Sequence, residues 1–317
     1  LHMGHGFQNT LMDVLARFKR SKGFDVLWQV GTDHAGIATQ IVVERNLEKE
    51  GKTKESLGRK KFEKEIWKWK KQSGSTITKQ LRRLGASLDW ENEKFTMNED
   101  FNEAVTEVFC SLYDEGLIYK GFRLANWDIK LQTALSDLEV ISTEEKGKIW
   151  EISYNTDLGN LVIATTRPET MLGDVAIAVN PEDQRYKKFI GRKAIIPLIK
   201  REIPIIGDSY VDIEFGTGCL KITPGHDFND FEIGKKNNLP LINIMNSDGT
   251  LNSSVPKKYQ SLTMVEARKK ILIDLKSSGN LIKEKDHRIT IPKSDRTGVI
   301  LEPFLTEQWY LKSNEMA

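Results

Sequence analysis

The chain has 317 residues, 39% of them hydrophobic and 29% charged, so it is long enough for two domains with separate cores. Its 47 basic and 45 acidic residues nearly balance at a formal net charge of +2, and charge alone therefore gives no argument for a nucleic-acid partner.

Cysteine usage and hydropathy exclude two further classes of protein. The two cysteines, Cys110 and Cys219, are far apart in apolar surroundings, which favours neither a disulfide framework nor a structural zinc site. No apolar run approaches the roughly 18 residues of a membrane span, and no signal peptide opens the chain. We therefore expect a cytoplasmic protein without a membrane partner.

The first 50 residues predict an alternation of helix, strand and helix. A first helix is indicated by apolar residues at helical spacing, namely Phe7, Leu11, Val14, Leu15 and Phe18. Gly23 should end it, and residues 24–30 read as a strand. Thr32-Asp33-His34 then leads into a second helix over about 35–50. In an open parallel sheet, this edge between strand ends and helix starts is where ligands bind.

A long, strongly charged helical region follows over 54–84. Its basic residues could contact RNA phosphates, and they are Lys60, Lys61, Lys64, Lys68, Lys70, Lys71, Lys79, Arg82 and Arg83. Glutamates interleaved at ion-pair spacing favour a solvated helix face instead. Asn98 then marks the start of a helix that Gly116 closes, and residues 117–138 are expected to be extended.

From about residue 142 the character of the sequence changes. Charged and small residues at 142–148 indicate a linker, after which short apolar strands dominate: 149–154, 161–164, 175–179, 194–199, 203–206, 219–222 and 241–245. Helical patches are expected at 181–190, 228–237 and 264–278. Short strands with turn signals between them favour a closed or barrel-like β domain with a few helices, and residues 288–303 read as a return to the first domain.

The stretch 164–174 contains more polar chemistry than a turn requires. Three threonines, Arg167 and Glu169 lie between two apolar strands, while the usual turn residues appear only at its end. We interpret this stretch as the wall of a pocket.

Several of these segments match one family. His2-Met3-Gly4-His5 resembles the HIGH motif of the class I aminoacyl-tRNA synthetases, and residues 31–40 resemble a segment of their valine-specific branch. Further matches run through residues 84–90, 95–97, 126–128, 136–140, 164–174, 216–230 and 295–309, so the resemblance covers essentially the whole chain. It implies an α/β fold: a partial Rossmann-type catalytic domain over 1–143, an inserted β-barrel-like α+β editing domain over 144–290, and a return segment over 291–317.

For the synthetic reaction, the resemblance implies an ATP site at His2, Gly4 and His5, with Mg²⁺ expected beside the ATP and no structural zinc. Imidazoles and helix N–H groups suit the phosphates of ATP while a valine carboxylate attacks the α-phosphorus. Asp33 would hold the ammonium group of valine and Trp309 would line the valine pocket. The alternatives are a helix-capping histidine pair, a plain N-cap at Asp33 and a core aromatic at Trp309.

For hydrolysis, the resemblance implies a second site. A valine pocket cannot strongly reject threonine, so threonine wrongly attached to tRNA(Val) must be removed by cleavage of the ester. The family positions of that editing site are matched by Arg167, Thr170, Phe215, Lys221, Asp227 and Asp230. One aspartate would hold the substrate ammonium and the other the threonine hydroxyl, while water attacks the activated ester directly. The alternative for the aspartates is acidic charge in the first turn of the helix at 228–237.

The expected partners are tRNA(Val), L-valine and ATP, with a monomeric chain. The family's strand before the HIGH motif, its KMSKS loop and its anticodon-binding domain have no match here, so we expect weak synthetic activity and a competent editing site. Three other interpretations stay open: an isoleucyl- or leucyl-type synthetase, a general α/β nucleotide-binding protein, and a non-catalytic tRNA-binding module.

Overall fold

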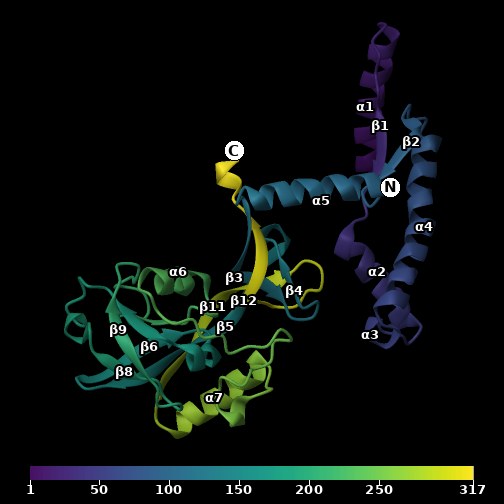
Figure 1. The fold of residues 1–317 in the computed structure, drawn as a ribbon. Coiled ribbons are helices and arrows are strands. Elements are labelled where there is room, and N and C mark those ends of the chain that lie inside the picture. The colour runs from purple at the N-terminus through teal and green to yellow at the C-terminus, as the bar shows by residue number, and fades with distance from the viewer. Residues whose placement is uncertain (317) are drawn as a thin grey trace. The chain divides into compact units, whose positions relative to one another are not determined.

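The chain forms two compact units in the computed structural model, which describes residues 1–316 except for the side chain of Ser75. Unit 1 comprises residues 1–118 together with the chain from Lys312 onward, and unit 2 comprises Tyr119–Leu311 (Figure 1). This division follows spatial contacts, and the functional boundaries expected at 143 and 290 stay a prediction.

Unit 1 is mainly helical. Its elements are α1 (Met3–Ser21), β1 (Gln29–Thr32), α2 (Gly36–Lys49), α3 (Lys54–Leu57), α4 (Arg59–Arg83), β2 (Asp89–Phe95) and α5 (Glu99–Asp114). Strands β1 and β2 pair in parallel, so the chain crosses from strand through helices to a second strand, β2, that was not predicted. Gly23 and Gly58 have φ values of 81° and 73°, and each stands where a helix ends, since glycine adopts this conformation without strain.

The bounds of the strand predicted at residues 24–30 of unit 1 were wrong. Only residues 29–32 of the strand region are paired, whereas residues 24–28 lack strand structure. The side chains of Phe24 and Leu27 are exposed, so apolar character there does not reflect burial in a sheet. No helix in the described part of the chain is both long and apolar enough to cross a membrane.

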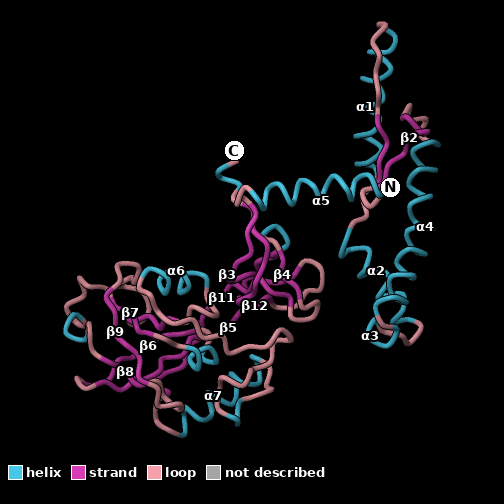
Figure 2. The backbone as a smooth tube through the Cα atoms, viewed as in Figure 1, coloured by secondary structure: helices cyan, strands magenta, loops and turns pink. Residues whose placement is uncertain are grey.

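Unit 2 is built on strands. They are β3 (Ile118–Asp128), β4 (Thr133–Leu135), β5 (Val140–Thr156), β6 (Gly159–Thr165), β7 (Ala176–Val179), β8 (Lys193–Ile195), β9 (Glu202–Gly207), β10 (Cys219–Ile222), β11 (Leu281–Ser294) and β12 (Leu301–Leu311). A seven-stranded sheet has the order β10-β7-β9-β8-β5-β11, with β6 paired to β5, and a second sheet has the order β12-β3-β4. Helices α6 (Phe228–Lys236) and α7 (Met264–Ser277) lie on opposite sides of the larger sheet (Figures 1 and 2).

The core of unit 2 follows from the side-chain periodicity of these elements. Alternate residues of β5 and β6, such as Ile152, Tyr154 and Ile163, point inward and are almost fully buried. Helix α7 adds Ile271 and Leu275, four residues apart on one face. These strands and α7 therefore share one core cluster, to which Met171 and Leu172 of the polar stretch 164–174 also belong.

The predicted linker at 142–148 was wrong, because these residues belong to β5 and pair with β11 in one long antiparallel ribbon (Figure 2). Their charged composition suggested a loop, but the ribbon is held by its backbone ladder and by cross-strand ion pairs. Lys148 pairs with Glu284, Lys293 with Glu145 at 2.5 Å, and Lys285 with Glu151 at 2.5 Å.

Two smaller predictions in unit 2 also need correction. The segment 241–245 forms no strand, only an isolated bridge between Met245 and Leu251. The helix expected at 181–190 is reduced to one 3₁₀ turn, Lys187–Phe189. Before that turn, the Asp183 carboxylate accepts from the backbone N of Arg185 at 2.9 Å, and such local side-chain bonds compete with a regular helix.

Candidate functional site

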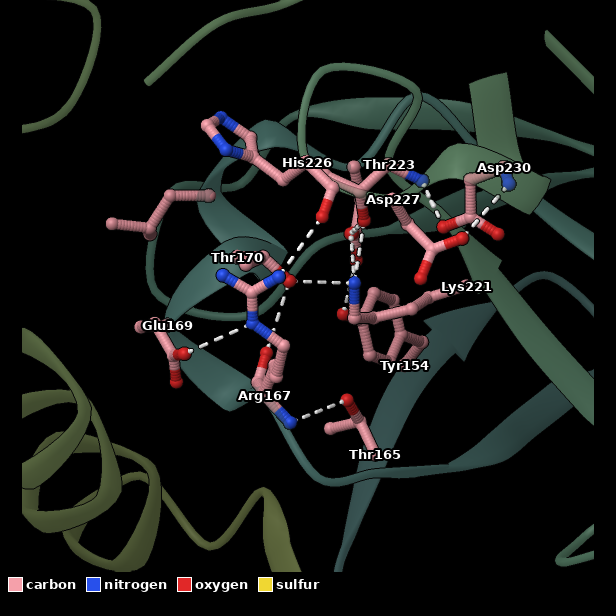
Figure 3. Close-up of polar contacts among 12 residues, drawn as sticks. Tyr154, Thr165, Arg167, Glu169, Thr170, Lys221, Thr223, His226, Asp227 and Asp230 are labelled. Atoms are coloured by element: carbon pink, nitrogen blue, oxygen red, sulfur yellow. Dashed lines mark hydrogen bonds and ion pairs between the residues drawn. The ribbon is translucent and has the colours of Figure 1, made fainter. Parts of the chain in front are cut away.

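The stretch 164–174 forms a buried polar turn between two strands. Strand β6 ends at Thr165, a 3₁₀ helix covers Pro168–Gly173, and β7 begins at Ala176. Thr165 Oγ1 accepts from the backbone N of Arg167 at 3.1 Å, and Thr170 Oγ1 donates to the carbonyl of Arg167 at 3.0 Å (Figure 3). Every residue of the 3₁₀ helix is buried, so this polar segment faces the interior of unit 2.

A second wall comes from β10 and the segment leading into α6. Lys221 lies on β10 and its Nζ donates to Thr170 Oγ1 at 2.7 Å. Arg167 Nη1 donates to the carbonyl of His226 at 2.9 Å. These two bonds join stretches about 50 residues apart in sequence, as Figure 3 shows. The structure therefore brings together the two segments that the sequence singled out.

The Lys221 ammonium is held by three oxygen atoms. Besides Thr170, it donates to Thr223 Oγ1 at 2.5 Å and contacts Asp174 Oδ1 at 3.3 Å. Thr223 Oγ1 donates to Asp174 Oδ1 at 2.6 Å, and the Tyr154 hydroxyl donates to Asp174 Oδ2 at 2.7 Å. Burial raises the pKa of Tyr154 well above its usual value, so the phenol stays a donor. The buried charges are thus paired, and the Lys221–Asp174 ion pair joins β10 to the polar turn.

Asp227 and Asp230 lie at the start of α6, and they have different environments. Asp227 Oδ1 accepts from the backbone N of Asn229 at 2.8 Å and of Asp230 at 3.1 Å, so the helix-terminus alternative is confirmed for Asp227. Asp230 is only 5% exposed and accepts from the backbone N of Thr223 at 2.8 Å. Burial raises the pKa of Asp230 to about 7, which places its proton exchange in the neutral range.

Phe215 lies on the loop before β10, and its side chain is 65% exposed. The neighbouring Gly216 has φ of 62°, and a Cβ there would meet the Cβ of Ala164 at 3.3 Å. Glycine therefore lets this loop approach the end of β6, beside the polar turn. The aromatic side chain remains at the surface, and Asp227 is exposed as well. The other four residues of the predicted hydrolytic set lie in the polar turn or its facing wall, and they are Arg167, Thr170, Lys221 and Asp230.

No role was predicted for His226, and its side chain is buried and bonded to the backbone. Its Nε2 accepts from the backbone N of Ile244 at 3.0 Å, and burial lowers the pKa of the imidazole to about 3. The ring is therefore neutral at physiological pH and does not serve as a base there. Its carbonyl, by contrast, is an acceptor for Arg167.

Sequence reasoning missed several residues that shape the site. Asp174 and Thr223 lie inside the two matched stretches, and a search of those stretches for buried polar partners could have found them. Tyr154 lies in an apolar strand without any local polar signal. Glu302, which pairs with Arg167, lies 135 residues away in the matched stretch 295–309, and nothing in that stretch indicated a contact with Arg167.

In unit 1, His2 and His5 together cap α1. His2 Nδ1 accepts from the backbone N of Gly4 at 3.1 Å, His5 Nδ1 accepts from the backbone N of His2 at 3.4 Å, and the rings lie 4.0 Å apart. The capping interpretation of this pair is therefore confirmed. Both imidazoles are exposed, and each takes part in the cap through Nδ1.

Asp33 lines a cavity of about 520 Å³ within unit 1. Its Oδ1 accepts from the backbone N of Ala35 at 2.5 Å, whereas the helix-capping residue of α2 is Ala35 itself, so Asp33 is not a plain N-cap. The cavity also has aromatic walls from α4 and β2, namely Trp67, Trp69 and Phe95. Trp309 belongs to unit 2 and is 51% exposed, so it is not a core aromatic of that unit.

Comparison with known proteins places the chain in one family. The model of the family tRNA synthetases class I (I, L, M and V) matches residues 1–317. The chain is 55% identical to a valine–tRNA ligase of Dechloromonas aromatica over 98% of this chain and 33% of that protein. It is 57% identical to the valine–tRNA ligase of Coxiella burnetii over 100% of this chain and 35% of that protein. The chain thus spans about a third of the length of these relatives. A solved LeuRS–tRNA–LeuAMS complex of Agrobacterium radiobacter K84 covers 95% of this chain and 44% of its own, at 19% identity and a TM-score of 0.39.

Proposed function

The chain belongs to the class I tRNA synthetases of the isoleucine, leucine, methionine and valine group, and from that premise we propose that it is a segment of a valine–tRNA ligase. In the reaction, the carboxylate of valine attacks the α-phosphorus of ATP and pyrophosphate leaves. A ribose hydroxyl of tRNA(Val) then attacks the carbonyl of the adenylate, and AMP leaves. The level of identity to two valine-specific relatives supports valine over isoleucine or leucine.

Unit 1 would contribute to the synthetic reaction. His2, Gly4 and His5 begin α1, where exposed imidazoles and the first helix N–H groups suit the phosphates of ATP. Asp33 lies in a cavity large enough for an amino acid, and its carboxylate suits an ammonium group. For Trp309, on β12 of unit 2, a role in valine binding is what the family resemblance implies. Among the described residues no group of three His, Cys, Asp or Glu side chains is placed to hold a metal, and the Mg²⁺ expected beside the phosphates of ATP stays a prediction.

Unit 2 would hydrolyse threonine from mischarged tRNA(Val). Water attacks the ester carbonyl of Thr-tRNA(Val), the ribose oxygen leaves with a proton, and threonine and tRNA(Val) are released. The ester is already activated, so a positioned water and paired carboxylates are sufficient. Such a site is needed because a hydrophobic pocket does not strongly reject an isostere that carries a hydroxyl.

The carboxylates provide the recognition. Asp227 uses Oδ1 to cap α6, and its second oxygen is available to the ammonium group of the substrate. Asp230 accepts one bond from Thr223, and its remaining acceptor capacity suits the hydroxyl of threonine, which valine lacks. A carboxyl with a pKa of about 7 can also take a proton from the attacking water near neutral pH.

The observation that carries the hydrolytic proposal is the meeting of the stretches 164–174 and 216–230. Lys221 on one stretch donates to Thr170 on the other, and Arg167 donates to His226 beside the aspartates. A general nucleotide-binding protein would need neither contact.

Replacing Asp230 by Ala tests the proposal. The chain and the variant are incubated with Thr-tRNA(Val), and both deacylation and tRNA(Val) binding are measured. We expect the variant to lose deacylation and to keep tRNA binding. Asp157→Ala is the control, since Asp157 lies in the same unit in an exposed pair with Arg192. Unchanged deacylation in Asp230→Ala, or a parent chain that binds tRNA without deacylating it, would favour a non-catalytic binding module.

A further inference from the structure

Glu302 reaches Arg167 from a different sheet. Its strand, β12, pairs with β3 in the three-stranded sheet, whereas Arg167 follows β6 at the edge of the larger sheet. The carboxylate of Glu302 nevertheless bonds Nη2 of Arg167, and the Glu302 side chain is only 12% exposed. A charge this well shielded differs from the surface ion pairs of the β5–β11 ribbon.

The guanidinium of Arg167 is oriented by acceptors on three separate segments. Nη1 donates to the carbonyl of His226 at 2.9 Å, Nη2 donates to Glu302, and Nε lies 3.6 Å from Glu169 Oε1. The plane of a guanidinium fixes the directions of its N–H groups, so placing Nη2 also places Nη1. Glu302 thereby determines how Arg167 meets the His226 carbonyl.

Glu169 does not replace Glu302 in this task. It is completely buried and accepts two bonds from Arg268 of α7, each of 2.7 Å. Without Glu302, two arginines would share this one carboxylate, and the better-aligned partner is Arg268. Arg167 would then be the arginine that is free to turn away.

The His226 carbonyl is the link to the site. It belongs to the peptide group that joins His226 to Asp227, so its position helps to determine where the Asp227 carboxylate lies. We propose that Glu302 is a positioning residue for the hydrolytic site: it orients Arg167, and Arg167 in turn holds the peptide group that joins His226 to Asp227. This proposal rests on the hydrolytic function proposed above for unit 2.

The test is a double-mutant cycle on deacylation of Thr-tRNA(Val) by the full 317-residue chain, measured in single turnovers. We expect Glu302→Ala to lower the rate by about 10- to 100-fold, the scale of a misplaced site group. In an Arg167→Lys background, the same change should lower the rate by at most about threefold, because the residue through which Glu302 acts is already altered. Glu302→Gln keeps an acceptor for Nη2 and should recover part of the rate lost in Glu302→Ala.

Glu307→Ala is the matched control. Glu307 lies on the same strand in an exposed pair with Lys120 at 2.6 Å, and its loss should change deacylation by less than about twofold. Each variant is checked for folding by circular dichroism, and if Glu302→Ala fails to fold, the cycle is run with Glu302→Gln.

Two results would overturn the inference while the proposed function stands. One is a parent chain that deacylates normally with Glu302→Ala unaffected. The other is a loss of rate that is equally large in the Arg167→Lys background, since Glu302 would then act independently of Arg167. A folded parent chain without any deacylation would instead overturn the proposed function and the inference together.

Discussion

Replacing Asp230 by Asn is expected to stabilise unit 2 at neutral and alkaline pH while it slows hydrolysis. The reason is burial: the folded state disfavours the ionised carboxylate, and the pKa of Asp230 rises to about 7 from a usual 3.8. The Asn side chain keeps an oxygen that can accept from the backbone N of Thr223, so the bond that Asp230 makes in the fold is preserved.

The magnitude follows from linkage between protonation and folding. A rise of the pKa from 3.8 to about 7 penalises the ionised folded state by about 4 kcal/mol, at about 1.4 kcal/mol per pKa unit. Below about pH 4 both the folded and unfolded chains carry a protonated Asp230, so the variant gains nothing there. The gain should grow as pH rises from about 4 to 7, and above 7 it should stay constant at up to about 4 kcal/mol.

The assay is urea unfolding at pH 4, 6 and 8, followed by pulsed hydrogen exchange on peptides from β6, β7 and β10. These peptides report unit 2 separately from unit 1. A variant that is less stable than the parent at pH 8, or whose gain is the same at pH 4 and pH 8, would refute the reasoning from burial.

Two further predictions concern the same site. The rate of Thr-tRNA(Val) deacylation should rise with pH and level off above an apparent pKa of about 7, because ionised Asp230 is the form that accepts hydrogen bonds and protons. The measurement is the pH profile of kcat/KM for the parent chain and for Asp230→Asn. The same pH dependence in both proteins would contradict this prediction. Lys221→Met should lower the unfolding free energy of unit 2 by about 3–5 kcal/mol, since Asp174 is fully buried and would lose its charged partner. Adding Asp174→Asn should recover part of that loss, and a double variant that is as unstable as the sum of the single variants would argue against a charge-paired core.

Local patterns in the sequence predicted most of the elements that position the site. The apolar run at 219–222 and the helices near 228–237 and 264–278 were confirmed, because their hydrophobic periodicity directly reflects which faces are buried. The part of the ribbon formed by residues 142–148 of β5 and 286–292 of β11 was missed for the opposite reason. None of these residues is buried, so strand pairing there is held by the backbone and by charges on a partner strand that the local sequence does not reveal.

The candidate site shows the same limit. Arg167, Thr170, Lys221 and Asp230 were singled out through their motifs, and the structure places them on two facing walls. The roles of Asp227 as a helix cap and of His2 and His5 as a capping pair were recognised as alternatives, and the contacts show both caps. The substrate roles of the same residues stay proposals. Glu302 depends on packing between two sheets, and no pattern along the chain could predict that contact.

The most direct test of the account compares deacylation of Thr-tRNA(Val) and Val-tRNA(Val) by the 317-residue chain under identical conditions. A site in which Asp230 recognises a hydroxyl should release threonine faster than valine, by at least about tenfold for one well-made hydrogen bond to a charged group. Equal rates for the two substrates, or a threonine rate no faster than spontaneous hydrolysis, would contradict the central claim that unit 2 is a hydrolytic site selective for threonine.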